Sequence, residues 1–281
     1  MAFDAPGVAP GSHLKLSFVS RTIEPAIYDK SRFLPYIKEH ERGYGQLTVR
    51  KVTRASGSTI ASTDDGTNVT FQGAGLTPVT MAPTWLYVAH QYPDSMKNQG
   101  GDEVDGALVD NLQSAMAEYL EYTLLQNLAT FTNTSGNAAT DVDAALFRGA
   151  VAQLFNTGKM EAEPGENAIY GILGALQLDD IMSIPEFTNA DQRGDGEMPL
   201  VKGIVSKGYG VRMLFSTLLY SDASGSHGGL WTKRAIGHYF NKRIGIEKQR
   251  YLKSNRIMVD TEVASNVVYN QLGWQLLHKA A

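Results

Sequence analysis

The 281-residue sequence contains no cysteine, so it forms no disulfide, thiol nucleophile or thiolate zinc site. Its formal net charge of −4 lacks the basic excess expected of a protein that grips duplex DNA tightly. No stretch approaches the ~20 consecutive apolar residues of a membrane-spanning helix. Residues 1–11 also lack the charged start and apolar run of a secretory signal. We expect a soluble protein with no membrane partner.

Motifs that carry catalysis or bind cofactors are missing as well. Asp191–Glu197 resembles a calcium loop, but Arg193 stands where such a loop needs an oxygen ligand. Gly208-Tyr-Gly210 lacks the further glycine of a dinucleotide-binding loop, and Ser226 has no nucleophile elbow around it. The six histidines are scattered along the chain. We therefore predict no catalytic residue, no cofactor and no metal site, and hence no enzymatic activity.

The N-terminal segment contains several prolines and only short apolar runs. Proline fixes φ and removes a hydrogen-bond donor, so residues 1–42 should form an extended arm and not a packed helix. For residues 1–15, an arm that lies over another surface and a disordered tail are equally compatible with the sequence.

The next segment has the pattern of a projecting hairpin. Apolar and polar residues alternate over residues 47–50 and again over 68–72, as in strands, and the polar stretch 54–66 between them has no core-forming pattern. Paired glycines bracket the hairpin and are predicted to act as its hinges: Gly43, Gly45, Gly73 and Gly75. Since a lone two-stranded ribbon is only marginally stable in water, it should rest on the body or on another subunit.

A helical pattern follows from Asp102, a plausible N-cap. Leucine, alanine, methionine and tyrosine recur at three-to-four spacing from Leu108 onward, opposite a mostly polar face. A helix over residues 103–129 would be roughly 40 Å long, longer than is usual in a compact domain. We expect it to serve as a spine.

The remaining pattern mixes helices and strands without a regular βαβ rhythm, which favours the α+β class. Asp143 is the predicted N-cap of a helix that ends at Gly158, and a further helix is predicted over 175–182. Strands are predicted over 168–173, 201–205, 211–215 and within 257–277. Residues 189–198 and 222–229 read as loops.

The order of these elements resembles the major capsid proteins of tailed bacteriophages, which have the Hong Kong 97-like fold. "LVDNLQSAMAEYLEYTLLQNL" (108–128) is similar to the spine helix of that family, and "DVDAALFRGAVAQLF" (141–155) to the first helix of its axial domain. "GHYFNKRIGIEKQRYLKSNRIMVDTEVASNVVYNQLGWQLL" (237–277) resembles the return from the axial domain to the peripheral strands. The resemblance implies an N-terminal arm (1–42), an E-loop hairpin (43–82), a peripheral (P) domain (83–140 and 247–281) and an axial (A) domain (141–246).

The resemblance also implies a function. The chain would self-assemble into pentamers and hexamers that form the icosahedral head around double-stranded phage DNA. It would be assembled in the host bacterial cytoplasm and reside in the virion. The alternative is another phage structural component, such as a tail or decoration protein. Complementary charges on the hairpin would meet a neighbouring subunit: Arg50, Lys51, Arg54, Asp64 and Asp65.

Further partners follow from how the sequence departs from the family. No long charged helical extension precedes the arm, so either a separate scaffolding protein exists or such a segment was removed before this chain was defined. Met1 favours the separate scaffolding protein, which we expect together with a portal and possibly a decoration protein. Lys51 lies near the base of the hairpin, so covalent cross-linking through a hairpin lysine is not expected. The stretch from Lys233 to Arg256 carries eight basic residues and one acidic residue. It is either a solvated or interface-paired face, or a weak, non-specific contact with packaged DNA.

Overall fold

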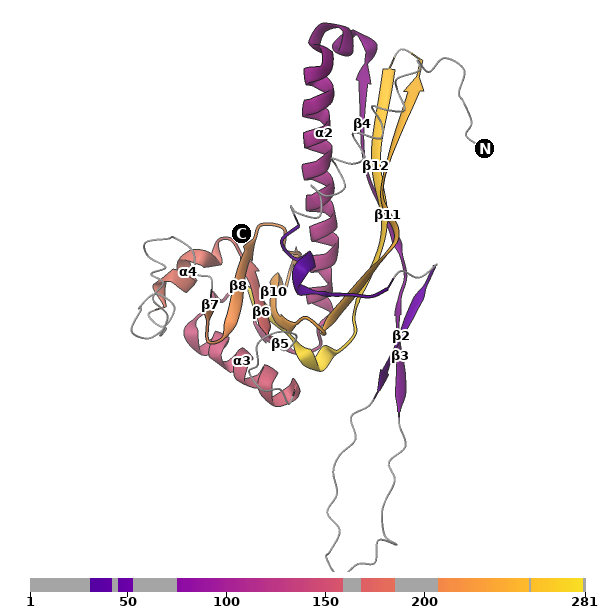
Figure 1. The fold of residues 1–281 in the computed structure, drawn as a ribbon. Coiled ribbons are helices and arrows are strands. Elements are labelled where there is room, and N and C mark those ends of the chain that lie inside the picture. The colour runs from indigo at the N-terminus through magenta and orange to yellow at the C-terminus, as the bar shows by residue number, and fades with distance from the viewer. Residues whose placement is uncertain are drawn as a thin grey trace, which may run out of the picture.

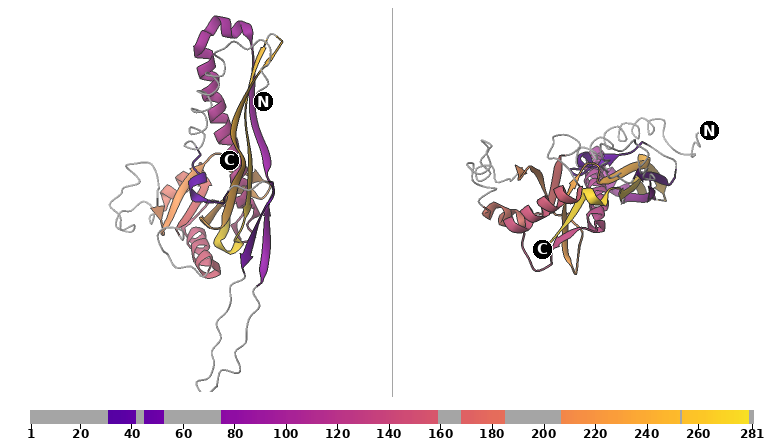
Figure 2. Two further views of the ribbon diagram at one scale, coloured as in Figure 1. Left: turned by 45° about the vertical axis from the view of Figure 1, so that its right-hand side comes forward. Right: turned by 90° about the horizontal axis from the view of Figure 1, so that it is seen from below.

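A computed structural model of the chain describes residues 31–41, 45–52, 75–158, 168–184, 207–252 and 254–279. The molecule is elongated (Figure 1). A long helix and a ribbon of strands run side by side, a compact lobe sits against one end of that helix, and a hairpin extends away from the body. In both views of Figure 2, the ribbon and the lobe are distinct parts of the molecule.

The ribbon is a four-stranded sheet in the order β1 (Lys38–Glu39), β11 (Ile236–Tyr251), β12 (Ser254–Val267) and β4 (Thr84–Pro93). β1 joins in parallel, and the other neighbours are antiparallel. β11 and β12 form one long hairpin, in which Leu252 adopts a positive φ of 53° at the turn. The 16-residue strand β11 was not predicted, because its many basic residues hide the alternating pattern.

Helix α2 (Asp94–Leu125) covers one face of this sheet and continues as a 3₁₀ helix (Gln126–Thr130). Its buried side chains Leu112, Met116, Leu120 and Leu124 recur at helical spacing and pack in one core with apolar residues of β4 and β12. The predicted apolar face is confirmed except at Tyr119, which is 44% exposed.

The predicted start of the helix, at Asp102 and residue 103, is wrong. The helix begins at Asp94, directly after the extended Pro93 that ends β4. Asp94 accepts hydrogen bonds from Asn255 (2.8 Å) and Arg250 (3.3 Å) on the neighbouring hairpin. The start is therefore fixed by partners more than 150 residues away, which local pattern does not reveal.

The lobe holds a mixed seven-stranded sheet: β5 (Thr134–Gly136), β13 (Gly273–His278), β10 (Gly225–Thr232), β6 (Ile169–Gly174), β8 (Val211–Ser216) and β7 (Lys207–Gly208), with β9 (Ser221–Asp222) paired to β10. Helices α3 (Ala144–Gly158) and α4 (Gln177–Ser183) pack against it. Asp143 caps α3 as predicted, since its carboxylate accepts a 2.7 Å hydrogen bond from the Leu146 N–H.

The predicted loop over residues 222–229 is wrong, because this stretch contains β9 and most of the central strand β10. All eight residues of β10 are buried. The strand reads as a loop because it is rich in glycine and polar residues, but close packing demands those glycines. A Cβ at Gly228 would lie 2.7 Å from the carbonyl oxygen of Ile172.

The projecting hairpin consists of β2 (Leu47–Val52) and β3 (Leu76–Met81), paired antiparallel from Leu47↔Met81 to Val52↔Leu76. The strand predicted over 47–50 is confirmed. The strands predicted over 68–72 and 201–205 and the loop predicted over 189–198 lie outside the described residues.

Candidate functional site

The point where the hairpin joins the body has a defined geometry. Gly45 lies just before β2 with φ +73°, in the left-handed region that disfavours other residues, and no atom lies within 4 Å of where a Cβ would be. Glycine is therefore required there for backbone conformation and not for space. Gly75, on the other side, is exposed directly before β3, and Gly43 and Gly73 lie outside the described residues. The hinge role of the four glycines stays a prediction.

Side chains of β11 and β12 hold both sides of this junction. The Tyr239 hydroxyl donates to the carbonyl of Gly45 and lies 3.4 Å from the carbonyl of Met81. The side-chain oxygen of Asn241 accepts a 3.0 Å bond from the Gly45 N–H. Asn266 donates to the Thr80 carbonyl at 2.9 Å. No local sequence pattern reveals these residues, because they lie far from the hairpin in the chain.

The base of the hairpin rests on its own body. Leu47 and Val49 are half-buried and pack with Tyr269 against a small core of Met81, Tyr239, Ala264 and Val268. This contact fixes one face of β2 and leaves the other exposed.

Two of the five charged residues predicted to contact a neighbour are described, and they point to opposite faces of β2. Arg50 is exposed. Lys51 is half-buried, with its ammonium 5.6 Å from the centre of the Tyr269 ring, a cation–π distance. Arg54, Asp64 and Asp65 lie outside the described residues, so the contact role of the whole set stays a prediction.

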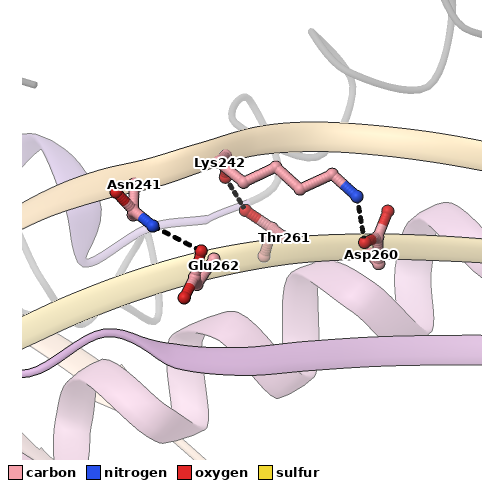
Figure 3. Close-up of polar contacts among 5 residues, drawn as sticks. All are labelled: Asn241, Lys242, Asp260, Thr261 and Glu262. Atoms are coloured by element: carbon pink, nitrogen blue, oxygen red, sulfur yellow. Dashed lines mark hydrogen bonds and ion pairs between the residues drawn. The ribbon is translucent and has the colours of Figure 1, made fainter. Parts of the chain in front are cut away.

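A polar cluster lies where β11 is irregular (Figure 3). The register of β11 with β12 shifts between Phe240 and Lys242 and again between Lys242 and Gly245. Lys242 pairs with Asp260, whose side chain is fully buried while that of Lys242 is 41% exposed. The bulge also turns Asn241 toward β12, where its amide donates to Glu262 at 2.5 Å.

The basic segment from Lys233 to Arg256 is partly paired within the chain. Lys242 meets Asp260, Arg250 meets Asp94, and Arg256 donates to the Gln91 side chain at 2.9 Å. These contacts favour a paired, solvated face over a dedicated surface for nucleic acid.

The outer face of the four-stranded sheet, opposite α2, carries two exposed aromatic side chains. Trp85 and Tyr87 on β4 are 60% and 63% exposed, whereas Leu86 between them is buried against the core of α2. The Lys242 ammonium lies 5.2 Å from the Trp85 ring centre. The alternation of β4 could have revealed this face, but β4 was not recognised as a strand in the sequence.

Polar residues that lie far apart in the sequence come together in the lobe. His227 on β10 lies 3.0 Å from Asp222 through one ring nitrogen and contacts Gln275 on β13 through the other. The hydrogen bond from His227 lowers the pKa of Asp222. Because the ring is buried between Asp222 and Gln275, the arrangement is that of a structural histidine.

A cleft of about 490 Å³ lies between the middle of α2, Arg32 and the segment after β8. Glu121 lines it, is largely buried and accepts a 2.9 Å bond from the Arg32 N–H. Burial raises the pKa of Glu121. Among the described residues, no group of three or more histidine, aspartate or glutamate side chains could hold a metal ion, and no described helix has the length and apolarity to cross a membrane.

No protein-family model and no curated protein sequence matches the chain. Solved structures do match over nearly the whole length. A structure from Mycobacterium phage Che8 has a TM-score of 0.70 at 15% identity, covering 88% of this chain and 90% of that one. The capsid of cyanophage P-SCSP1u has a TM-score of 0.69 at 13% identity, covering 89% of each chain. A virus-like particle from Pyrococcus furiosus has a TM-score of 0.59 at 10% identity, covering 91% of this chain and 98% of that one.

The chain has the Hong Kong 97-like fold. As a proposal, we assign β2–β3 to the base of the E-loop hairpin, α2 to the spine helix, the four-stranded sheet to the P domain and the lobe to the A domain of this fold, and we name the four-stranded sheet the P-domain sheet. The P–A boundary proposed at 246/247 falls inside the continuous strand β11, and β13 lies in the sheet of the lobe. The exact domain limits stay a prediction.

Proposed function

We propose that the chain is the major capsid protein of a tailed phage and assembles into pentamers and hexamers of an icosahedral shell around double-stranded DNA. The observation that carries this proposal is a Hong Kong 97-like fold, shared over about 88% of the chain with structures from phages, combined with a hairpin that projects from the body. A free two-stranded ribbon is marginal in water, so a neighbouring subunit is its natural support.

The exposed aromatic pair supports the same proposal. Trp85 and Tyr87 offer a large apolar surface on the face of the sheet that α2 does not cover. Aromatic residues of this kind are enriched at the centres of protein interfaces. In a shell, each subunit would bury interfaces of the obligate kind, beyond roughly 2,000 Å².

The decisive experiment is expression of the full chain alone, followed by size-exclusion chromatography with light scattering and negative-stain electron microscopy. We expect rings, shells or aggregates. Tubes or small trimers would favour the alternative of a tail or decoration protein. A stable monomer with a folded hairpin would contradict both.

The hairpin charges provide a sharper test. We propose that Arg50, Lys51 and Arg54, with Asp64 and Asp65, set the register between neighbouring subunits. Exposed pairs contribute only ~0.2–1 kcal/mol each, but each subunit of a shell repeats them. Reversing Arg50 and Arg54 to Asp should therefore raise the concentration needed for assembly several-fold. Reversing Arg148, exposed on α3, is the matched control.

The proposed partners follow from the same assignment. A separate scaffolding protein and a portal would act during assembly in the bacterial cytoplasm, and a decoration protein could bind the finished virion. Packaged DNA would be contacted weakly and without sequence preference. Co-expression with the neighbouring structural genes, and the ratio of absorbance at 260 and 280 nm of purified particles, would test these points.

A further inference from the structure

One buried hydroxyl contacts both sides of the junction between hairpin and body. Tyr239 is fully buried in the small core with Met81, Ala264 and Val268. Its hydroxyl faces Gly45, where the chain enters the hairpin, and Met81, where it leaves. A phenol has one proton to donate, so the bond goes to the Gly45 carbonyl, and the Met81 carbonyl at 3.4 Å is the second acceptor within reach.

Burial also keeps this donor in place over a wide pH range. It raises the pKa of Tyr239, so the ionisation that would remove this donor is shifted to higher pH. Within the described residues, the Gly45 carbonyl belongs to no sheet ladder, since β2 begins only at Leu47. The Tyr239 hydroxyl therefore supplies a partner within the protein for this carbonyl.

Asn241 holds the other backbone group of the same residue. Its side-chain oxygen accepts from the Gly45 N–H, while its amide donates to Glu262 on β12. Asn241 lies between the register partners Phe240 and Lys242, so it is the extra residue of a β-bulge. Bulges re-aim side chains, and this one aims Asn241 at the hairpin root (Figure 3 shows its bond to Glu262).

We propose that Tyr239 and Asn241 are the positioning residues that set the direction in which the hairpin leaves the body, and thereby the geometry in which it meets a second copy of the chain. This inference rests on the proposed shell function. It assigns the hairpin's orientation to the P-domain strand β11 and not to the glycines alone.

A small change at the root has a large effect further out. Each hairpin strand has six described residues, so at about 3.3 Å per residue it reaches ~20 Å from the root. A rotation of ~10° at Gly45 would move its far end by ~3 Å over that length. Displacements of that size are enough to misplace contacts between neighbouring subunits, because packed interfaces tolerate little mismatch.

The test uses Tyr239→Phe, Asn241→Ala and the double variant in the full-length chain. Hydrogen exchange is measured on unassembled protein, and particle diameter by electron microscopy after assembly. Loss of one hydrogen bond should speed exchange of the amides of residues 46–52, 76, 77 and 79–81 about fivefold and leave α2 unchanged. The particles should spread over more than one diameter. Tyr119→Phe, a partly exposed tyrosine on α2, is the matched control and should change neither readout.

Each outcome has a definite meaning. Wild-type exchange in the hairpin together with wild-type particle diameters in both single variants would overturn the proposal. Faster exchange spread over α2 as well would also overturn it, because it would show general destabilisation. If the wild-type chain forms no shells, the proposed function fails, yet the exchange measurement still decides whether Tyr239 and Asn241 hold the hairpin.

Discussion

The two sheets of the molecule are built on opposite principles. The central strand β10 of the lobe is buried along all eight residues, with packed layers on both faces. In the P-domain sheet, β4 alternates between buried and exposed residues, and the far end of β11, residues 247–250, is exposed. Both faces of the lobe sheet are covered within one chain, whereas the P-domain sheet has α2 on one face and leaves part of the other, at Trp85 and Tyr87, exposed.

The stabilising contacts differ accordingly. The lobe is held by dense apolar and aromatic packing, in which Trp231 contacts Phe33 at 5.0 Å between ring centres and donates to the Tyr36 carbonyl at 3.0 Å. The outer side of the P-domain sheet depends on individual polar pairs such as Lys242–Asp260. When one packing contact is lost, many others remain, whereas a lost ion pair has no substitute.

The strongest expected contrast lies between two tryptophans. Trp231→Ala should destabilise the protein by about 4 kcal/mol, because it removes a fully buried aromatic side chain. Trp85→Ala should change stability by less than ~0.5 kcal/mol, since Trp85 is largely exposed, but should weaken assembly. Urea denaturation and light scattering measure the two effects. Equal losses of stability would contradict the contrast between the sheets.

The ion pair between the half-exposed Lys242 and the buried Asp260 should come next. Lys242→Met would leave the Asp260 carboxylate buried without its cation, at a cost of about 3 kcal/mol. Adding Asp260→Asn should recover much of that loss, because the remaining buried group is neutral. Denaturation of the four proteins of this double-mutant cycle gives the coupling. Additive effects would show that the pair does not stabilise the bulge.

Acid should weaken the edge of the P-domain sheet that receives the arm. Burial, with smaller contributions from His40 and Lys233, lowers the pKa of His238 from 6.5 to about 4. Below pH 6.5 the unfolded chain binds a proton that the folded chain does not bind until about pH 4, so stability falls as pH drops. The expected loss is about 2 kcal/mol between pH 7 and 5. His238→Gln should flatten this slope in urea titrations, and an unchanged slope would contradict the assignment.

The smallest effects are expected when alanine replaces either of two glycines. Gly45→Ala should cost about 1 kcal/mol, because alanine disfavours the positive φ at the hairpin root. The same substitution at Gly149, exposed in α3 with open space around its Cβ position, should stabilise by up to about 1 kcal/mol. Thermal denaturation of both variants checks the opposite signs. A stabilising Gly45→Ala would show that the backbone there relaxes freely.

Local pattern predicted the elements whose partners are close in sequence. The strand at Leu47–Arg50, the Asp143 cap and the apolar face of α2 were all visible as periodicity or capping chemistry. Pattern failed where long-range packing decides. β10 reads as a loop because buried glycines leave no hydrophobic signal, and α2 begins at Asp94 because β12 and β11 supply its partners.

The sequence by itself determined the α+β class, the order of arm, hairpin, spine helix and lobe, and the absence of thiol chemistry, because composition and periodicity act locally. Only the tertiary structure decided what holds the hairpin. Gly45 meets Tyr239 across 194 positions and Asn241 across 196, through a bulge that no local pattern encodes. The direction of the hairpin is therefore a property of the folded body, since the backbone bonds that fix it end on strands formed at the far end of the chain.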